Sequence, residues 1–185
     1  MANNVSNSIE IRYDKTNEEM NTFCKKVQET YENNRPLTDI FDTYIEETCN
    51  TRIWWEDNIG AKWAYFEDSY YDPGLLEFHI QSAWGEVRPL VEYISSMLNN
   101  ECSIMHTYID EMPNFAGCYV LVDGEMVYEF DDQDLTETLN EEAQVRMNEQ
   151  NIEFETEDEF YDWMWDWKWD YVHDLIEPEE NLMDR

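Results

Sequence analysis

Five aspartates recur at every fourth position near the end of the chain: Asp158, Asp162, Asp166, Asp170 and Asp174. Four residues advance an α-helix by about 6 Å and turn it by about 40° beyond one revolution, so a helix here would carry the five carboxylates in one slowly winding row. A DNA strand also presents a row of anionic groups, which advances about 3.4 Å along the axis per nucleotide. Carboxylates in this arrangement can therefore bind a basic surface built for phosphates.

A helix over residues 157–176 would position this row. Thr156 can cap its start, with Glu159 at the third helical position, and Glu177-Pro178 should stop it. Acidic residues in the first turn also interact favourably with the helix dipole and so stabilise the helix. Aspartate is a poor helix former, however, and like charges four residues apart destabilise a helix, so other residues must stabilise this one.

Two apolar stripes on the same helix can supply that stabilisation. The first stripe contains Phe160, Trp163, Met164, Trp167, Tyr171 and Leu175. The second stripe contains Tyr161, Trp165, Trp169, Val172 and Ile176. One stripe can dock on the rest of the chain, which leaves the other for a partner or a second subunit. The predicted partner-binding residues are Glu155, Asp158, Glu159, Asp162, Trp165, Asp166, Trp169, Asp170 and Asp174.

Patterns typical of catalysis or metal binding are missing from the sequence. It has no G-x-S-x-G, no Gly-rich phosphate loop and no H-E-x-x-H. The histidines lack regular ligand spacing, and we interpret each as structural: His79, His106 and His173. The cysteines lack C-x-x-C spacing and are expected to be reduced, mostly buried thiols: Cys24, Cys49, Cys102 and Cys118. We therefore predict no enzyme, no cofactor and no metal site.

Three weaker interpretations stay open. Cys118 could pair with His79 or His106 as a nucleophile, but nothing in the sequence brings them together. The aspartates at positions 131, 132 and 134 lack the pattern of a calcium loop, so a solvated turn that caps the next helix is favoured. Trp63 and Trp84 could line a small-ligand pocket, although we favour the interpretation that they close one end of a sheet core.

The composition limits the choice of partner. The chain of 185 residues has 44 acidic and 11 basic residues, for a net charge of -33. Its aromatic content of 15% predicts a folded protein despite this charge. Direct binding to nucleic acid or to an anionic membrane is excluded, because both rest on Lys and Arg, and a basic partner is favoured. The polar start, Met1 to Ser8, has no secretion signal, and no apolar run of 18 residues is present, so we expect a cytoplasmic protein.

The charge divides the chain into two parts. Residues 131–185 hold 20 acidic and 3 basic residues, which is half of the net charge in under a third of the length. This shift predicts a domain over 1–130 and an acidic helical extension over 131–185.

The first part reads as mixed α/β. Alternation and turn signals predict strands at 5–13, 62–66, 75–81, 103–109, 118–122 and 126–130. Helices are predicted from Thr16 to about residue 35, over 38–48 and over 87–98, and Asp123-Gly124 predicts a tight hairpin. The order predicts an α+β fold, with an antiparallel sheet and helices on one face, followed by the acidic, Trp-rich helical C-terminal extension.

Short segments of this part resemble the YubB-like proteins of phages and plasmids. They are 1–11, 58–63, 81–85, 110–117 and 123–125, so the resemblance covers residues 1–128. That family implies a ferredoxin-like fold and an origin on a mobile genetic element. The chain departs from the family at Asn4-Val5, where Trp-Cys is usual, and at Gly85–Pro89, where a Pro-rich stretch is usual. No catalytic residues carry over.

Charge, row and resemblance together predict a phage- or plasmid-encoded DNA mimic. It would inhibit a host nucleic-acid-binding defence complex, as anti-CRISPR or anti-restriction proteins do, by occupying a basic DNA channel. The predicted partner is thus a basic host protein, either a defence nuclease or a CRISPR effector. An alternative is a non-enzymatic adaptor or homodimer that uses the C-terminal aromatic helix.

Overall fold

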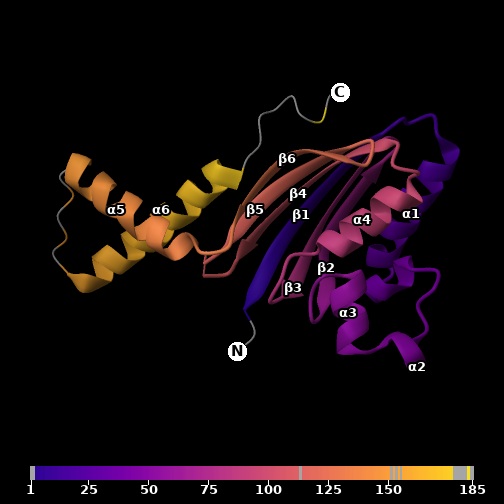
Figure 1. The fold of residues 1–185 in the computed structure, drawn as a ribbon, viewed down its shortest axis with the longest axis horizontal. Helices are drawn as coiled ribbons and strands as arrows, with labels where there is room; N and C mark the ends of the chain where they lie inside the picture. Colours follow the sequence, from indigo (N-terminus) through magenta and orange to yellow (C-terminus); the bar gives the residue numbers. More distant parts are fainter. Residues whose placement is uncertain are drawn as a thin grey trace.

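A six-stranded antiparallel sheet forms the centre of the molecule, in the order β2-β3-β1-β4-β5-β6 (Figure 1). The computed structural model describes residues 3–112, 114–150, 152, 154, 156–176 and 183, without the side chains of residues 47 and 48. Its strands are β1 (Asn4–Tyr13), β2 (Ala64–Asp72), β3 (Leu75–Ala83), β4 (Cys102–Asp110), β5 (Ala116–Val122) and β6 (Glu125–Asp132). The predicted α+β class is confirmed.

The helices lie on both faces of this sheet (Figure 1). They are α1 (Glu18–Glu32), α2 (Glu46–Cys49), α3 (Arg52–Asn58), α4 (Arg88–Met97), α5 (Leu135–Gln150) and α6 (Glu157–Ile176), with the 3-10 turn η1 (Leu37–Ile40). One face packs against α1, η1 and α4, through a core that includes Ile9, Phe78 and Ile104. The opposite face packs against α5 and α6. The prediction of helices on one face of the sheet is therefore correct only for α1 to α4, because α5 and α6 lie on the opposite face.

The burial pattern of β5 explains why α5 and α6 cover the second face of the sheet. Residues 116–121 are all buried, so this strand has no face that tolerates water. Cys118 and Ile109 face a second core, where Leu139 of α5 and Val172 of α6 cover them. Strands β1 and β3 present polar residues on that same face, including Ser8 and His79, and these need no cover. The helical cover is therefore confined to the β4–β6 half of the face.

Several predicted boundaries move in the structure. Asn17, not Thr16, caps α1, because its Oδ1 accepts hydrogen bonds from the backbone N–H groups of Glu19 and Met20 at 3.1 and 3.2 Å. Helix α3 was not predicted: its seven residues are too few for a periodic signal, and none is buried. Strand β2 runs to Asp72 rather than to residue 66, since an edge strand accepts charged and exposed residues.

The predicted hairpin at Asp123-Gly124 is confirmed. Both residues have positive φ, at 52° and 78°, as a two-residue type I′ turn requires. The turn joins β5 to β6, so β6 becomes the edge strand after which the chain crosses to α5.

A fully buried polar cluster connects β1, β3 and β4. The Nδ2 group of Asn7 donates to Val5 O, Ile80 O and Ser82 Oγ at 3.0, 3.2 and 2.9 Å. Its Oδ1 must then accept, and it lies 3.0 Å from His106 Nε2. His106 is therefore neutral with its proton on Nε2. Complete burial, together with the nearby Arg88 guanidinium, lowers its pKa to about 3.

Gly117 is required by the ring of Tyr108. A Cβ atom at this position would collide with the phenol and would lie 2.7 Å from Phe130 O. We expect Gly117→Ala to lower the free energy of unfolding by about 2–3 kcal/mol, measured by urea denaturation. Tyr108→Phe is the control, because it removes only the 2.7 Å hydrogen bond to Asp131. A cost of Gly117→Ala no larger than that of Tyr108→Phe would show that the collision is relieved without strain.

Candidate functional site

Helix α6 begins where its cap was predicted. Thr156 Oγ1 accepts a hydrogen bond from the backbone N–H of Glu159 at 3.3 Å. Glu157, Asp158 and Glu159 fill the first turn, where carboxylates interact favourably with the helix dipole. The start of the acidic helix is therefore stabilised locally.

The five aspartates of α6 are all exposed, and we call them the acidic row. No Lys or Arg of α6 other than Lys168 accompanies them. The row advances about 6 Å per member and turns about 40° in the right-handed sense, which gives a pitch of about 54 Å. A strand of B-DNA also winds right-handedly, with a turn of about 34–36 Å. Glu159 is exposed beside the row, whereas Glu155 lies outside the described residues.

The first aromatic stripe packs within the helical arm formed by α5 and α6. Trp163 and Trp167 stack at 6.0 Å, and Trp167 and Tyr171 stack at 5.1 Å. Phe154, which precedes α6, contacts Phe160 and Trp163 at 5.5 and 5.6 Å. These ring contacts continue along the helix to Trp167 and Tyr171, which also pack against the second core on the sheet.

The second stripe docks on the sheet only at its end. Val172 and Ile176 are buried there, whereas Trp165 is 43% exposed and Tyr161 is 64% exposed. At 3.6 residues per turn these side chains share one side of the helix. The N-terminal half of α6, which carries the exposed ones, lies apart from the sheet (Figure 1). The prediction that one whole stripe docks and the other stays free is therefore wrong. Both stripes contribute to the second core at the C-terminal end of α6.

Helix α5 adds carboxylates that are not among the predicted partner-binding residues. Glu137, Glu141, Glu142 and Glu149 are all exposed, and the basic residue of the helix is Arg146. The signal that could have found them is the charge of residues 131–185, which is too large for α6 alone. The anionic surface therefore extends over both helices of the arm.

The uncovered half of the sheet carries acidic residues as well. Glu10 of β1 and Glu77 of β3 are direct cross-strand partners in the register. Like charges directly opposite one another destabilise a sheet, and Arg12 offsets this cost with an ion pair to Glu10 at 2.5 Å. The strand register brings these two carboxylates together, so the sequence alone could not indicate the pair.

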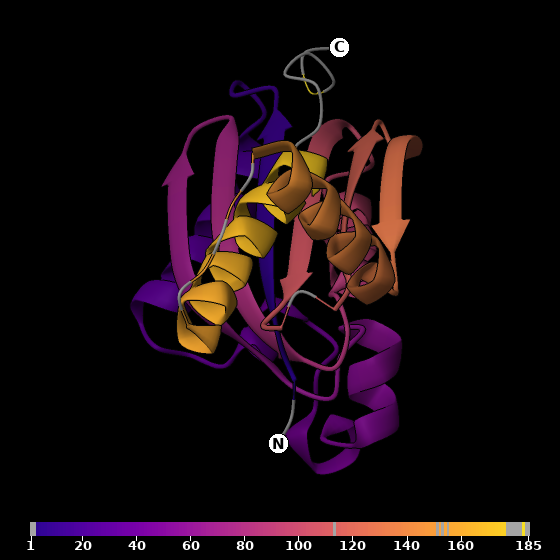
Figure 2. The same cartoon turned by 90° about the vertical axis from the view of Figure 1, so that its left-hand side faces the viewer.

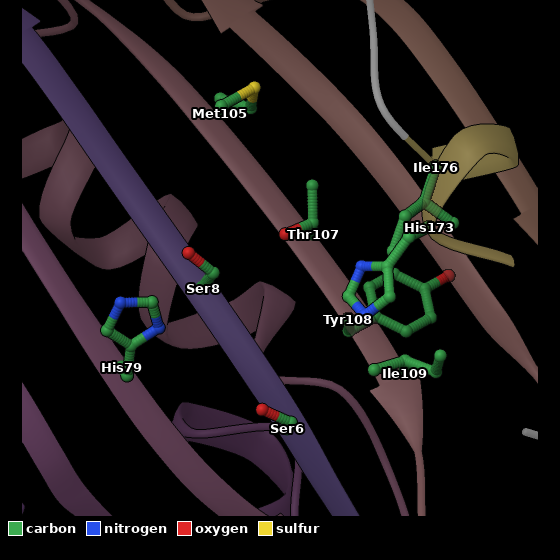
Figure 3. Close-up of a pocket in the computed structure, with 9 residues that line it drawn as sticks. All are labelled: Ser6, Ser8, His79, Met105, Thr107, Tyr108, Ile109, His173 and Ile176. Atoms are coloured by element: carbon green, nitrogen blue, oxygen red, sulfur yellow. The ribbon is translucent and has the colours of Figure 1, made fainter. Parts of the chain in front are cut away.

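An open pocket of about 440 Å³ lies where α6 leaves the sheet. Figure 3 shows Ser6 and Ser8 of β1 with His79 of β3 on one side, and His173 and Ile176 of α6 on the other. Thr107, Met105 and Ile109 of β4 form its floor. Among the described residues, its lining is hydroxylic, aromatic and apolar, with no carboxylate.

The other proposed chemistries gain no geometric support. Cys118 pairs with Thr107 in the register and so faces away from His106 on the neighbouring position of β4. Burial raises the pKa of the Cys118 and Cys24 thiols to about 12, which disfavours a nucleophilic thiolate. Among the described residues, no group of three or more His, Cys, Asp or Glu side chains is arranged to hold a metal ion.

Trp84 does not lie at one end of the sheet core, where we expected it. It is 59% exposed, with Lys62 Nζ 5.3 Å from its ring centroid, and it has a φ of 72°, which is strained for a bulky residue. Trp63 instead stacks on Tyr65 at 5.7 Å. Trp84 therefore does not close the sheet core.

Comparison with known proteins yields no relative. No family model, no curated protein and no solved structure matches the chain. The resemblance to YubB-like proteins thus stays a prediction. In the described part of the chain, no helix combines the length and apolar character needed to cross a membrane.

Proposed function

We propose that the protein is a DNA mimic, encoded by a phage or plasmid, that inhibits a nucleic-acid-binding defence complex of the host. Its target would be a restriction-type nuclease or a CRISPR effector, whose basic DNA channel it occupies. The observation that carries this proposal is the acidic row: five exposed aspartates that wind in the same sense as a DNA strand. Because the carboxylates are already ordered, they avoid the bending energy that DNA itself must pay.

The shape of the molecule supports entry into a channel. The arm of α5 and α6 projects from the sheet on the side away from α1 to α4 (Figure 1). Figure 2 shows the two helices side by side at the near end of the molecule, with α6 crossing toward β2 and α5 toward β6. A projecting anionic arm can reach basic residues inside a cleft, and the net charge of -33 would accelerate the encounter.

We also propose that the sheet contains a ferredoxin-like core, to which the arm is an extension. The element order β1-α1-β2-β3-α4-β4, with η1, α2 and α3 inserted between α1 and β2, supports this assignment, as does the strand order β2-β3-β1-β4. The hairpin partners β5 and β6 then widen the core, and the buried second face of β5 provides the docking site for the extension. The division at residue 131 stays part of this proposal.

A self-associating adaptor is a second candidate, favoured by the exposure of Tyr161 and Trp165. A homodimer would bring two chains of charge -33 together, and this repulsion opposes it. Light scattering at rising salt separates the two functions, because self-association should increase as the repulsion is screened.

Capture followed by competition tests the proposed function. The immobilised full chain is exposed to a host lysate, and each captured DNA-binding protein is then tested with its own DNA. Mimicry predicts that the chain and the DNA exclude one another, whereas a stable ternary complex of chain, enzyme and DNA would contradict it. Loss of the enzyme's cleavage activity in proportion to occupancy completes the expected result.

Salt should weaken the complex steeply. Because the predicted contact is made by exposed carboxylates and basic side chains, we expect the dissociation constant to rise at least 10-fold between about 0.1 and 0.5 M NaCl. Isothermal titration calorimetry at several NaCl concentrations measures this dependence. A dissociation constant that stays constant over this range would show that charge does not drive binding.

A further inference from the structure

We propose that the aromatic face of α6, together with the pocket beside it, binds an arginine-rich segment of the partner rather than a lysine-rich one. The aromatic face consists of the exposed Tyr161 and Trp165 and the half-buried Trp169. This inference rests on the proposed function, since it assumes that the anionic arm binds a basic protein, and it specifies which basic side chain the arm selects.

The sequence of α6 repeats one unit along the helix, an aspartate followed three residues later by a ring. The four units are Asp158 with Tyr161, Asp162 with Trp165, Asp166 with Trp169, and Asp170 with His173. Residues three apart are neighbours on a helix surface, so each ring lies beside a carboxylate. All four aspartates are exposed, and so each unit has an accessible anionic group.

Three of these rings, from Trp165 through Trp169 to His173, form a ladder that ends in the pocket. Trp165 and Trp169 have ring centroids 6.1 Å apart, and Trp169 and His173 have centroids 5.9 Å apart. His173 is itself part of the pocket wall, opposite Ser8 and His79 (Figure 3). A partner segment lying along α6 would therefore meet rings and carboxylates in turn and could place one side chain in the 440 Å³ pocket.

The charges around the aromatic face indicate which kind of ligand can bind there. The helix presents the acidic row on one side of the ladder, and the uncovered sheet presents Glu77 beside Glu10, whose charge Arg12 partly neutralises. Phosphate-bearing ligands are repelled by such surroundings, and so is a second copy of this chain. A cationic peptide segment is the occupant that complements both the charge and the apolar rings.

The alternation of ring and carboxylate favours arginine over lysine. A guanidinium is planar, so it can stack on an indole face while its N–H groups form paired hydrogen bonds with a neighbouring carboxylate. An ammonium group is a strongly hydrated point charge without this planar geometry. A plain acidic helix would attract both cations alike, so the rings should make the difference.

Matched peptides test this selectivity on the full chain. The probes are octa-arginine and octa-lysine, measured by calorimetry at one salt concentration. We expect octa-arginine to bind about 10-fold more tightly, from stacking at two or more rings. Trp165→Leu should reduce this preference at least 3-fold by weakening octa-arginine alone, whereas Trp165→Phe, which keeps a ring, should largely preserve it.

Trp63→Leu is the matched control, since Trp63 stacks on Tyr65 of β2 and lies outside the aromatic face. The preference of this variant for octa-arginine over octa-lysine should equal that of the unmodified chain. Equal affinity for the two peptides would overturn the inference and leave the proposed function standing, as would a preference that survives Trp165→Leu in a folded variant. Absence of binding to either peptide, together with no exclusion of DNA from any captured enzyme, would overturn both.

Discussion

Replacing Asp162, Asp166 and Asp170 together by asparagine is expected to weaken the complex with the basic partner roughly 100-fold, if each lost charge contact contributes about 1 kcal/mol. The three carboxylates are exposed and occupy the middle of the acidic row, where a partner lying along α6 would contact them. Calorimetry with the captured partner, or inhibition of its DNA cleavage, measures the loss.

The same variant should be at least as stable as the unmodified chain. Every like-charged pair along the row includes one of the three replaced residues, so the substitutions remove all four unfavourable spacings. Asparagine and aspartate have similar helix propensities, and we expect a gain of about 1 kcal/mol in the free energy of unfolding. Weaker binding therefore cannot be attributed to unfolding of α6.

A control with the same change in net charge isolates the position of the charges. Glu46, Asp57 and Glu92 are exposed on α2, α3 and α4, away from the arm. Replacing them by Gln, Asn and Gln should change the affinity by less than about 3-fold, through long-range attraction alone. If this control weakens binding as much as the row variant, the whole surface charge and not the row is responsible.

Acidification should destabilise the protein through His106. Its pKa is about 3 in the folded chain and close to 6.5 in the unfolded chain, so the unfolded chain takes up the proton first as the pH falls. The contribution of neutral His106 to stability is present above about pH 6.5 and decreases as the pH falls toward 3. Between pH 7 and pH 4 this amounts to about 3 kcal/mol.

The negative charge of the chain acts in the opposite direction, because protonated carboxylates repel one another less. Comparison with His106→Gln separates the two effects, since this variant keeps all carboxylates. Urea denaturation at pH 7 and pH 4 should show the gap between the two proteins shrinking by about 3 kcal/mol. NMR titration of the unmodified chain provides a check that needs no variant: a His106 ring that protonates near pH 6.5 in the folded state contradicts the assignment.

Local patterns in the sequence predicted most of the sheet. Alternation in β1 and the Asp123-Gly124 turn depend on neighbouring residues, so they could be recognised without the fold. The same is true of Thr156, whose capping role needs only the three residues that follow it. These elements were predicted because their determinants lie within one turn or one strand.

Features that depend on distant residues escaped prediction. The facing of Glu10 and Glu77 follows from the register of β1 with β3, across 67 positions of the chain, and the pocket needs β1, β3, β4 and α6 together. The exposure of Trp165 depends on where α6 leaves the sheet, which the apolar stripe of one helix does not encode. The docking of α5 and α6 required knowledge that β5 is buried on both faces.

The burial of β5 on both faces also limits how the chain can be truncated or its arm transferred. Cutting the chain after β6 would expose Ile109, Ala116 and Cys118 to water, and a truncated sheet of this kind is prone to aggregate. Transferring the arm alone to another scaffold would expose Val172 and Ile176, which are buried in the intact chain. The arm of α5 and α6 is thus not a portable module, and its surface can be varied only by substitution on an intact chain.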